Sequence, residues 1–433
     1  MKVLYRAENV YVAKRKPEPE GYMTEKVIYY ADKLHVSKDG ALYPAKNVYV
    51  CKYKEIPGDF DFVIRGDKYI IGDGLDWRWP DYDDEIRYTI NWGDGSVTVV
   101  DGNDISLRTH EYPYHGEWTI TITDYVSGAV FFGHYNDWGT GNGLVRILSP
   151  LPFNDRLTNL EFWFDGSDVL EEISCNLFQN MPNINNLTGC FESCESLRKI
   201  HPDMFCDNPL VTSLLRIFGK CGLTEIPEGL FRNQIAATTY SSAFHRNPNL
   251  TRIPENLFAN SPEVLDLSGI FYECFNLECI PEGLFTNNHK AATMQSCFYS
   301  CERITEIPGD LFANNPDIFH FGHTFGKCVG ITGIPGGLFR NNKAALAFPS
   351  TFSQCINIGE IPTGLFDNSL SARNFQDTFS MPSTDNALTG LAPKLWTWPA
   401  AFPPFSPTGP LGSRCFSGCV GLDNYDDIPA NWR

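Results

Sequence analysis

Hydrophobic residues recur at a fixed interval through the middle and C-terminal parts of the chain. Leu223–Asn233 spells LTEIPEGLFRN, and near copies of this phrase begin at Leu250 and Ile304. Its isoleucine returns in a regular series, in which successive residue numbers differ by 26 or 27, at Ile173, Ile200, Ile226, Ile253, Ile280, Ile307, Ile334 and Ile361. A period of this length predicts a solenoid, because one short unit cannot bury its apolar face without neighbours stacked on it.

One complete repeat is Phe271–Asn287, which follows the pattern F-x-x-C-x-x-L-x-x-I-P-x-x-L-F-x-N. Leu277 and Ile280 are predicted on a short strand, which Pro281 ends because proline cannot donate a hydrogen bond to the ladder. Short helical turns are predicted on both sides of this strand. The asparagine that closes the repeat is expected to hydrogen-bond backbone groups of the turn.

The cysteines follow the same repeat. Seven of the fourteen share its C position, namely Cys194, Cys221, Cys274, Cys301, Cys328, Cys355 and Cys419. No pair has the C-x-x-C spacing of a zinc ribbon or a thioredoxin-like redox site. We therefore expect a column of small, reduced, buried side chains, one per coil, rather than disulfides.

The repeat resembles the leucine-rich repeats of the BspA-like surface proteins, which are found widely in gut bacteria and in some of their phages. The resemblance covers roughly residues 138–433 and rests on the F-x-x-C-x-x-L spacing followed by I-P. The period, which is 27 in the step from Ile253 to Ile280, is longer than that of the commonest BspA-like unit. This difference affects the expected convex side and not the strand ladder. The resemblance implies that residues 131–433 form a leucine-rich-repeat solenoid with an irregular C-terminal cap.

Residues 56–130 have a different pattern, with alternating hydrophobic positions and tight turns. Tyr88–Val100 (YTINWGDGSVTVV) predicts a β-hairpin, and Trp118–Ile122 alternates as a half-buried strand does. These motifs resemble the polycystic-kidney-disease (PKD) domain, an immunoglobulin-like β-sandwich with W-x-F-G-D-G and H-x-Y-x-x-x-G-x-Y-x-V signatures. In that family the matching residues build the fold, so we interpret Asp94 as a turn residue rather than a calcium ligand. The resemblance is carried by Asn91, Trp92, Gly93, Asp94, Gly95, His110, Tyr112, Gly116, Trp118 and Ile120.

Residues 1–55 differ from the rest of the chain in charge. They hold eleven Lys and Arg against seven Asp and Glu, a charge of +4, whereas the whole chain carries −18. Two phrases, Glu8–Lys16 and Lys46–Lys54, predict strands that either pair with each other or dock onto another protein. We expect residues 1–55 to be a basic, β-rich anchoring segment. The predicted fold is therefore mainly β with short helices, in three parts.

Signatures of catalysis and cofactor binding are absent from the sequence. No GxGxxG opens a helix, and GxxxxGK[ST], HExxH and GxSxG do not occur. His320 and His323 stand three residues apart, but the equivalent positions of neighbouring repeats hold Thr, Ser and Ala, so no metal site is predicted. We expect no catalytic residue, no cofactor and no bound metal, and the acidic surface disfavours nucleic acid as a partner.

The repeat fails between Phe379 and Cys415, where LWTWPAAFPPFSPTGPLG (Leu395–Gly412) intrudes. Trp396 and Trp398 within this stretch are the predicted binding residues, because exposed tryptophans are common anchors for proteins and sugars. The alternative is that both tryptophans cover the end of the solenoid core, which needs a cap.

Both modules that the sequence resembles are binding or spacer modules where they occur. This favours a non-enzymatic structural and adhesive protein of a phage virion, namely a fibre, spike or decoration protein. The N-terminal segment would anchor it to other virion proteins, and the repeats would bind a host-surface protein or glycan. No apolar run reaches the about 18 residues of a membrane span, and the N-terminus lacks the apolar core of a signal peptide.

The lack of that core favours a virion protein, assembled in the host cytoplasm, over a bacterial cell-surface adhesin. A carbohydrate-active enzyme with a PKD-like spacer is a third alternative. Self-association is left open.

Overall fold

The computed structural model describes residues 59–71, 87–102, 104–127, 143–382, 386–398 and 410–433, together with six strands within residues 3–50. The chain divides into two compact units, Met1–Gly58 and Asp59–Arg433. The predicted boundaries at residues 55/56 and 130/131 lie outside the described residues.

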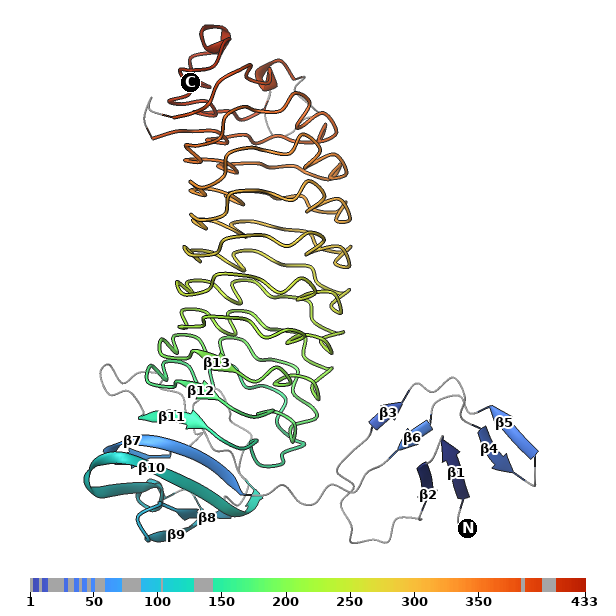
Figure 1. The fold of residues 1–433 in the computed structure, drawn as a ribbon, viewed down its shortest axis with the longest axis vertical. Helices are drawn as coiled ribbons and strands as arrows, with labels where there is room; N and C mark the ends of the chain where they lie inside the picture. The colour runs from blue at the N-terminus through green and yellow to red at the C-terminus, as the bar shows by residue number, and fades with distance from the viewer. Residues whose placement is uncertain are drawn as a thin grey trace. The chain divides into compact units, whose positions relative to one another are not determined.

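The first unit consists of short antiparallel strands (Figure 1). Its strands are β1 (Val3–Ala7), β2 (Val10–Lys14), β3 (Val27–Tyr29), β4 (His35–Lys38), β5 (Ala41–Pro44) and β6 (Val48–Val50). They form a sheet of order β2-β1-β4-β5 and a separate β3-β6 pair. The two echoing phrases supply β2 and β6, which belong to different sheets. The predicted strands are therefore present, but the alternative in which they pair with each other is wrong.

The second unit begins with a curved antiparallel layer. Its elements are β7 (Phe60–Ile70), β8 (Arg87–Asn91), β9 (Val97–Asp101), the 3₁₀ helix η1 (Ile105–Arg108) and β10 (Thr109–Ser127). The turn between β8 and β9 needs positive φ at Gly93 (84°) and Gly95 (95°). The Asp94 carboxylate accepts hydrogen bonds from Ser96, as expected of a turn residue.

All four strands of this layer belong to one sheet, of order β7-β10-β8-β9. Its core residue is Trp92, which is fully buried and donates from Nε1 to Thr98. Tyr112 donates from its hydroxyl to the Trp92 carbonyl and stacks on Trp118. The signature residues thus have structural roles here, as the resemblance implied. The second sheet of a sandwich is not seen among residues 59–71, 87–102 and 104–127.

The antiparallel layer continues directly into the coils. Strand β7 pairs antiparallel with β11 (Leu144–Ile147), which pairs parallel with β12 (Glu172–Ile173) and then β13 (Lys199–Ile200). The same seven-stranded sheet therefore spans both parts of the second unit, and one hydrophobic core runs from Phe60 to Trp432. The layer closes the first coil, which would otherwise expose apolar side chains.

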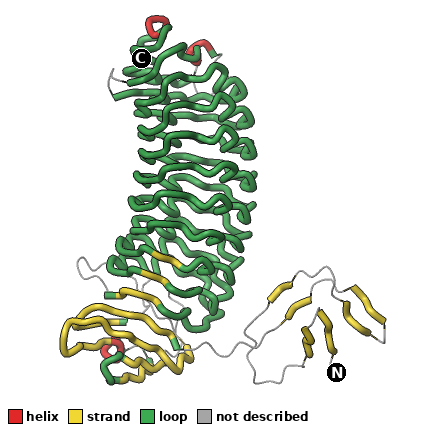
Figure 2. Tube along the Cα trace, viewed as in Figure 1, coloured by secondary structure: helices red, strands yellow, loops and turns green. Residues whose placement is uncertain are grey.

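The remaining coils stack one upon the next as a solenoid (Figures 1 and 2). A ladder of parallel bridges joins equivalent residues of successive coils, from Asn159–Asn186 through to Asn374–Leu411. Two columns of phenylalanine rings fill the interior, and within each column the ring centroids lie 5.0–6.4 Å apart in successive coils. Phe271 and Phe285, for example, each belong to one column and are fully buried. The repeats therefore build the predicted leucine-rich solenoid.

Turns replace the short helices that the pattern predicted within each coil. In the described coils, 3₁₀ helices occur only near the C-terminus, as η2 (Leu395–Thr397) and η3 (Tyr425–Asp427). The backbone N–H groups of Thr286 and Asn288 donate to the carbonyls of Gly283 and Phe285, three residues earlier in each case. Each of these hydrogen bonds closes a single turn. In the turns such as 268–273, alternate N–H groups bond the adjacent coil instead, which prevents helical continuation there.

The cysteine column is buried as expected. Every cysteine of the repeated slot donates its thiol to a phenylalanine carbonyl of the preceding coil, as Cys274 does to Phe244 at 3.2 Å. The thirteen described cysteines are all free thiols. Burial raises the pKa of the thiols of Cys274 and Cys355 to about 12. These side chains are structural and are held in the neutral form.

The closing asparagines tie each coil to the one before it. Asn180, Asn233, Asn287 and Asn341 donate to a backbone carbonyl of the preceding coil, whereas no such bond is found at Asn260, Asn314 and Asn368. A second, fully buried column lies one residue further along at Asn208, Asn288, Asn315 and Asn342. Each of these four donates to two carbonyls of the preceding coil. The predicted structural role is seen at part of the predicted positions, and the buried column, to which Asn208 belongs, was missed.

Candidate functional site

Each coil presents a short segment, here called the lateral turn, on one side of the solenoid. The lateral turns are 161–166, 188–193, 215–220, 241–246, 268–273, 295–300, 322–327, 349–354, 376–379 and 413–418. In 215–220 the second and sixth residues, Arg216 and Lys220, have φ of 56° and 54°, and the same two places are left-handed in 161–166 through 349–354. Left-handed backbone costs about 1–2 kcal/mol for a residue with a side chain.

Hydrogen bonds between coils offset this cost. Arg216 N–H donates to the Ser241 carbonyl at 2.9 Å, and Lys220 N–H donates to the His245 carbonyl at 2.7 Å. Because the left-handed residues are fixed, their side chains project from the solenoid in register, one coil above another. The lateral turns thus form a rigid surface whose side chains can vary without disturbing the core.

One coil in this surface is a residue short. In the other coils that hold a cysteine in the repeated slot, a leucine or isoleucine stands three residues later, and its backbone N–H donates to the cysteine carbonyl. Leu223 lies only two residues after Cys221 and does not make this bond. Its N–H is instead taken by the side-chain oxygen of Asn247, at 3.2 Å. Asn247 occupies the cysteine slot of the next coil and also donates to the Phe218 carbonyl at 2.8 Å. This residue therefore compensates for the shortened coil.

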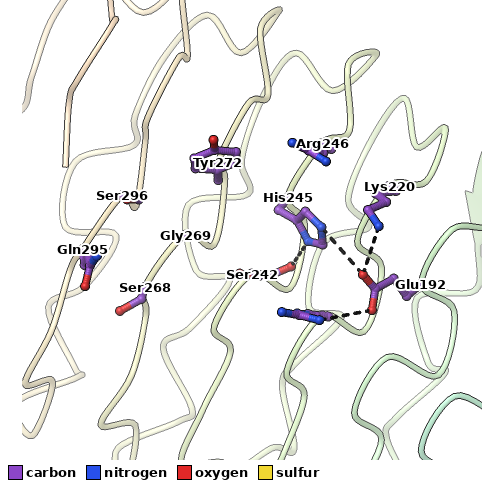
Figure 3. A pocket seen from close by; sticks show the side chains of 11 residues that line it. Glu192, Lys220, Ser242, His245, Arg246, Ser268, Gly269, Tyr272, Gln295 and Ser296 are labelled. Carbon is purple, nitrogen blue, oxygen red and sulfur yellow. Dashed lines mark hydrogen bonds and ion pairs between the residues drawn. The ribbon is translucent and has the colours of Figure 1, made fainter. Parts of the chain in front are cut away.

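A hollow of about 520 Å³ opens on the lateral turns beside the short coil (Figure 3). We call it the cationic hollow. Its lining contains three cations, Arg216, Lys220 and Arg246, against one carboxylate, Glu192. The rest of the lining is Ser242, His245, Ser268, Gly269, Tyr272, Gln295 and Ser296. The volume is in the range of small-molecule sites.

Glu192 is the most buried charged group of the cationic hollow, with 7% of its surface exposed. Its carboxylate lies 3.6 Å from Lys220 Nζ, 4.0 Å from Arg216 and 3.9 Å from His245 Nε2. All three separations exceed the length of a hydrogen bond. The carboxylate is therefore attracted by Lys220 and Arg216 and keeps acceptor capacity toward the hollow.

His245 lies over the backbone of Gly219, where a Cβ would approach its ring to 2.1 Å. Its Nδ1 is 2.8 Å from the Ser242 carbonyl oxygen, which can only accept, so Nδ1 carries the proton. Burial lowers the pKa of this imidazole below its usual value. At neutral pH the ring is then uncharged, and Nε2 is an acceptor on the side of the ring that lies toward Glu192 (Figure 3).

Tyr272 forms the far wall of the cationic hollow, and Tyr299 lies next to it. Tyr272 and Tyr299 stack with ring centroids 5.0 Å apart. The guanidinium of Arg246 lies over Tyr272 at 6.0 Å and also bonds the Glu273 carboxylate at 2.8 Å. Lys327 lies over Tyr299 at 5.4 Å. Both tyrosine faces are thus covered, and the wall offers ring edges and hydroxyls rather than open aromatic faces.

A second hollow, of about 510 Å³, continues beyond Tyr299 along the same surface. It is lined by serines and glutamines, with Lys327, His323 and a two-bond ion pair between Arg414 and Asp377. In that ion pair Arg414 and Asp377 neutralise each other's charge. The first hollow is the better candidate site because two of its cations, Arg216 and Lys220, come no closer than 3.6 Å to a carboxylate.

The predicted binding residues Trp396 and Trp398 lie at the C-terminal end of the core. Both are partly buried and packed against it. Trp398 meets Phe375 edge-on at 5.6 Å, and Trp396 meets Phe416 at 6.2 Å and Trp432 at 6.3 Å. These contacts favour the capping alternative. Their role in binding stays a prediction, and neither tryptophan lines the cationic hollow.

The comparisons with known proteins add little to this picture. No protein-family model and no curated protein matches the chain. Among solved structures, the Toll–Spatzle complex of Drosophila matches 54% of this chain and 38% of its own, at 18% identity and a TM-score of 0.29. The TLR13–ssRNA13 complex matches 54% and 44%, at 12% identity and a TM-score of 0.21.

A leucine rich cell surface protein of Faecalibacterium prausnitzii A2-165 matches 58% of this chain and 89% of its own, at 14% identity and a TM-score of 0.20. The chain spans less than half the length of the first two structures. Likeness at this level identifies no relative, so the solenoid is established by the hydrogen bonds and ring columns of this chain itself.

The histidine pair that the sequence singled out has structural partners. His320 Nδ1 accepts from Gly322 N–H at 3.2 Å, and His323 meets Tyr299 edge-on. Among the described residues, no three His, Cys, Asp or Glu side chains are placed to share a metal ion. The described part of the chain likewise has no helix with the length and hydropathy to cross a membrane.

Sequence reasoning missed the cationic hollow because its residues do not repeat. The signal was present in the aligned repeats, where Glu192, Gly219, His245, Tyr272 and Tyr299 occupy one column of successive coils. Because this column holds a different type of residue in most coils, no residue type recurs in it at the repeat interval, and a search for periodicity cannot detect it. Its neighbours in space come from other repeats, at least one full coil away along the chain, and so lie beyond the reach of a local motif.

Proposed function

We propose that this chain is a non-enzymatic binding protein that displays the lateral turns of a rigid solenoid to a ligand on a cell surface. The observation that carries the proposal is the cationic hollow, a set of unlike side chains held in fixed register on an otherwise repetitive stack. Binding surfaces need such preorganisation, since ordering flexible groups on association weakens affinity. The coils supply it through the hydrogen bonds that join one lateral turn to the next.

We further propose that the protein belongs to a phage virion, as a fibre, spike or decoration protein. The first unit would anchor it to other virion proteins, and the antiparallel layer would act as a PKD-like spacer. Support comes from charge, since residues 1–55 carry +4 in a chain of −18. It also comes from the thirteen free cysteines, which suit assembly in a reducing cytoplasm. A bacterial cell-surface adhesin is the alternative location.

Two measurements test this proposal. Fluorescently labelled full-length chain should attach to cells of a susceptible gut bacterium, and excess unlabelled chain should compete. Purified virions should contain the protein by mass spectrometry. A form lacking residues 1–55 should still fold, because residues 59–433 form a compact unit with its own core, yet it should be missing from the virions because it lacks the anchor. A shortened form that still enters particles would refute the anchoring role. A protein found only on bacterial cell surfaces would favour the adhesin.

A further inference from the structure

The cationic hollow is positive although the chain as a whole carries −18. Its lining has three cations against one carboxylate, with His245 uncharged at neutral pH. Arg246 is paired with Glu273 beside the lining, so the local excess is one positive charge, carried by Arg216 and Lys220. The cations lie at the rim, with about half of the Arg216, Lys220 and Arg246 side chains exposed. Exposed cations gathered against an acidic background attract an anion at short range.

Acceptors lie beneath these cations. Glu192 offers carboxylate oxygens whose nearest partners are 3.6 Å away or further, and His245 offers Nε2 as a lone-pair acceptor. Both groups are nearly buried, with 7% and 9% of their surfaces exposed. A buried acceptor gains from a ligand donor that reaches it, because an unmade hydrogen bond there is costly. The matching ligand must therefore carry hydroxyl donors as well as a negative charge.

The remaining lining is polar and small. Ser242, Ser268, Gln295 and Ser296 supply hydroxyl and amide groups around Gly269. The one aromatic side chain in the lining, Tyr272, has its faces covered by Tyr299 and Arg246. Protein partners are usually held by a central apolar or aromatic anchor in a desolvated pocket, and this lining offers none.

We infer that the cationic hollow binds an acidic saccharide, with the sugar carboxylate at Arg216 and Lys220 and its hydroxyls at Glu192 and His245. This rests on the proposed function and deepens it by naming the ligand class. An anionic group without hydroxyls would leave the buried acceptors unused, and a neutral sugar would leave the cations unused. Selectivity for the combination follows from having both sets of groups within one hollow.

Isothermal titration of the full chain with defined probes tests the inference. The probes are N-acetylneuraminate, D-glucuronate, D-glucose, inorganic sulfate and an Asp-rich hexapeptide. We expect an acidic sugar to bind at least tenfold more tightly than glucose, sulfate or the peptide, and its affinity to fall as salt rises. Equal binding of sulfate, tighter binding of the peptide, or no binding of either acidic sugar would each overturn the inference.

Three variants locate the site. Lys220→Gln should weaken the acidic sugar at least tenfold, whereas the matched change Lys343→Gln, at an exposed lysine outside the hollow, should leave it unchanged. Glu192→Gln should weaken the sugar, because the amide replaces one acceptor oxygen with a donor, and should not weaken sulfate, because it removes a negative charge from the hollow. Parallel loss of both probes in Glu192→Gln, or equal effects of Lys220→Gln and Lys343→Gln, would contradict the assignment. Thermal unfolding of each variant confirms that it is folded.

The outcome is separable from that of the proposed function. If labelled chain attaches to cells and none of the acidic sugars binds, the saccharide inference fails and the binding role stands. If an acidic sugar binds the hollow and the chain attaches to no cell surface, the inference stands and the surface-binding role fails.

Discussion

The two sides of a single lateral turn obey different rules. On the inward side, Phe218 repeats the phenylalanine of the coils above and below, the adjoining Cys221 repeats the cysteine of six other coils, and both are buried. On the outward side, Arg216, Gly219 and Lys220 differ from their equivalents above and below. The same backbone thus carries one set of positions selected for stacking and another that is free to specify a ligand. Repetition gives the solenoid its stability, and departures from repetition give it a site.

The largest expected effect concerns pH and the inward thiols. Unfolded cysteines titrate at about pH 8.5, whereas burial raises the pKa of Cys274 and Cys355 to about 12 in the folded chain. Below the unfolded pKa the thiols contribute fully to the free energy of unfolding. As pH rises toward 12 the unfolded chain loses thiol protons that the folded chain keeps, so this contribution falls by up to about 1.4 kcal/mol per pH unit for each thiol. Urea unfolding between pH 8 and 11 measures this loss.

The matched control for this prediction is the double variant Cys274→Ala/Cys355→Ala. Its unfolding free energy should fall less steeply with pH than that of the unchanged chain, because two buried thiols no longer titrate. Identical slopes for the two proteins would show that the thiol column does not govern the alkaline behaviour.

The inward phenylalanines give the next largest effect. Phe271 is fully buried between Phe244 and Phe298, with centroids at 5.9 and 5.8 Å. Phe271→Ala should lower the unfolding free energy by about 3–5 kcal/mol, because it removes a stacked ring and leaves a cavity. Phe275→Ala, the same change at a ring that is 39% exposed, should cost under about 1 kcal/mol. Equal losses would mean that the columns do not hold the stack together.

Asn247→Cys tests the inward position at which asparagine replaces the usual cysteine, beside the shortened coil. Cysteine is the usual residue of this slot, so the change looks conservative, yet it removes the acceptor for the buried Leu223 N–H. We expect a loss of about 1–3 kcal/mol in urea unfolding. Adding one residue after Gly222 in the same variant restores the regular spacing and should recover part of the loss. A fully stable Asn247→Cys protein would show that the asparagine does not compensate for the short coil.

The smallest effect on stability belongs to the outward side. Arg216→Gln/Lys220→Gln should change the unfolding free energy by under about 1 kcal/mol, because both side chains are about half exposed and neither comes within hydrogen-bond distance of Glu192, which water in the open hollow can solvate. A larger loss in urea unfolding would show that the outward cations also support the fold.

The inward side is also the side that the sequence predicted. Periodic positions such as Phe271, Cys274 and Ile280 can be assigned to the core because each is reinforced by its equivalents in the other repeats. The turns that replace the expected helices depend on left-handed residues such as Arg216 and Lys220, whose side chains carry no glycine signal. The cationic hollow depends on contacts across coils at positions that vary, so periodicity could not reveal it.

The central claim is that binding resides in the outward side chains of the lateral turns. Attachment of labelled full-length chain to susceptible cells, compared between the unchanged protein and Arg216→Gln/Lys220→Gln, tests it most directly. We predict at least a tenfold loss of attachment at an unaltered unfolding midpoint. Undiminished attachment of a folded double variant would contradict the claim.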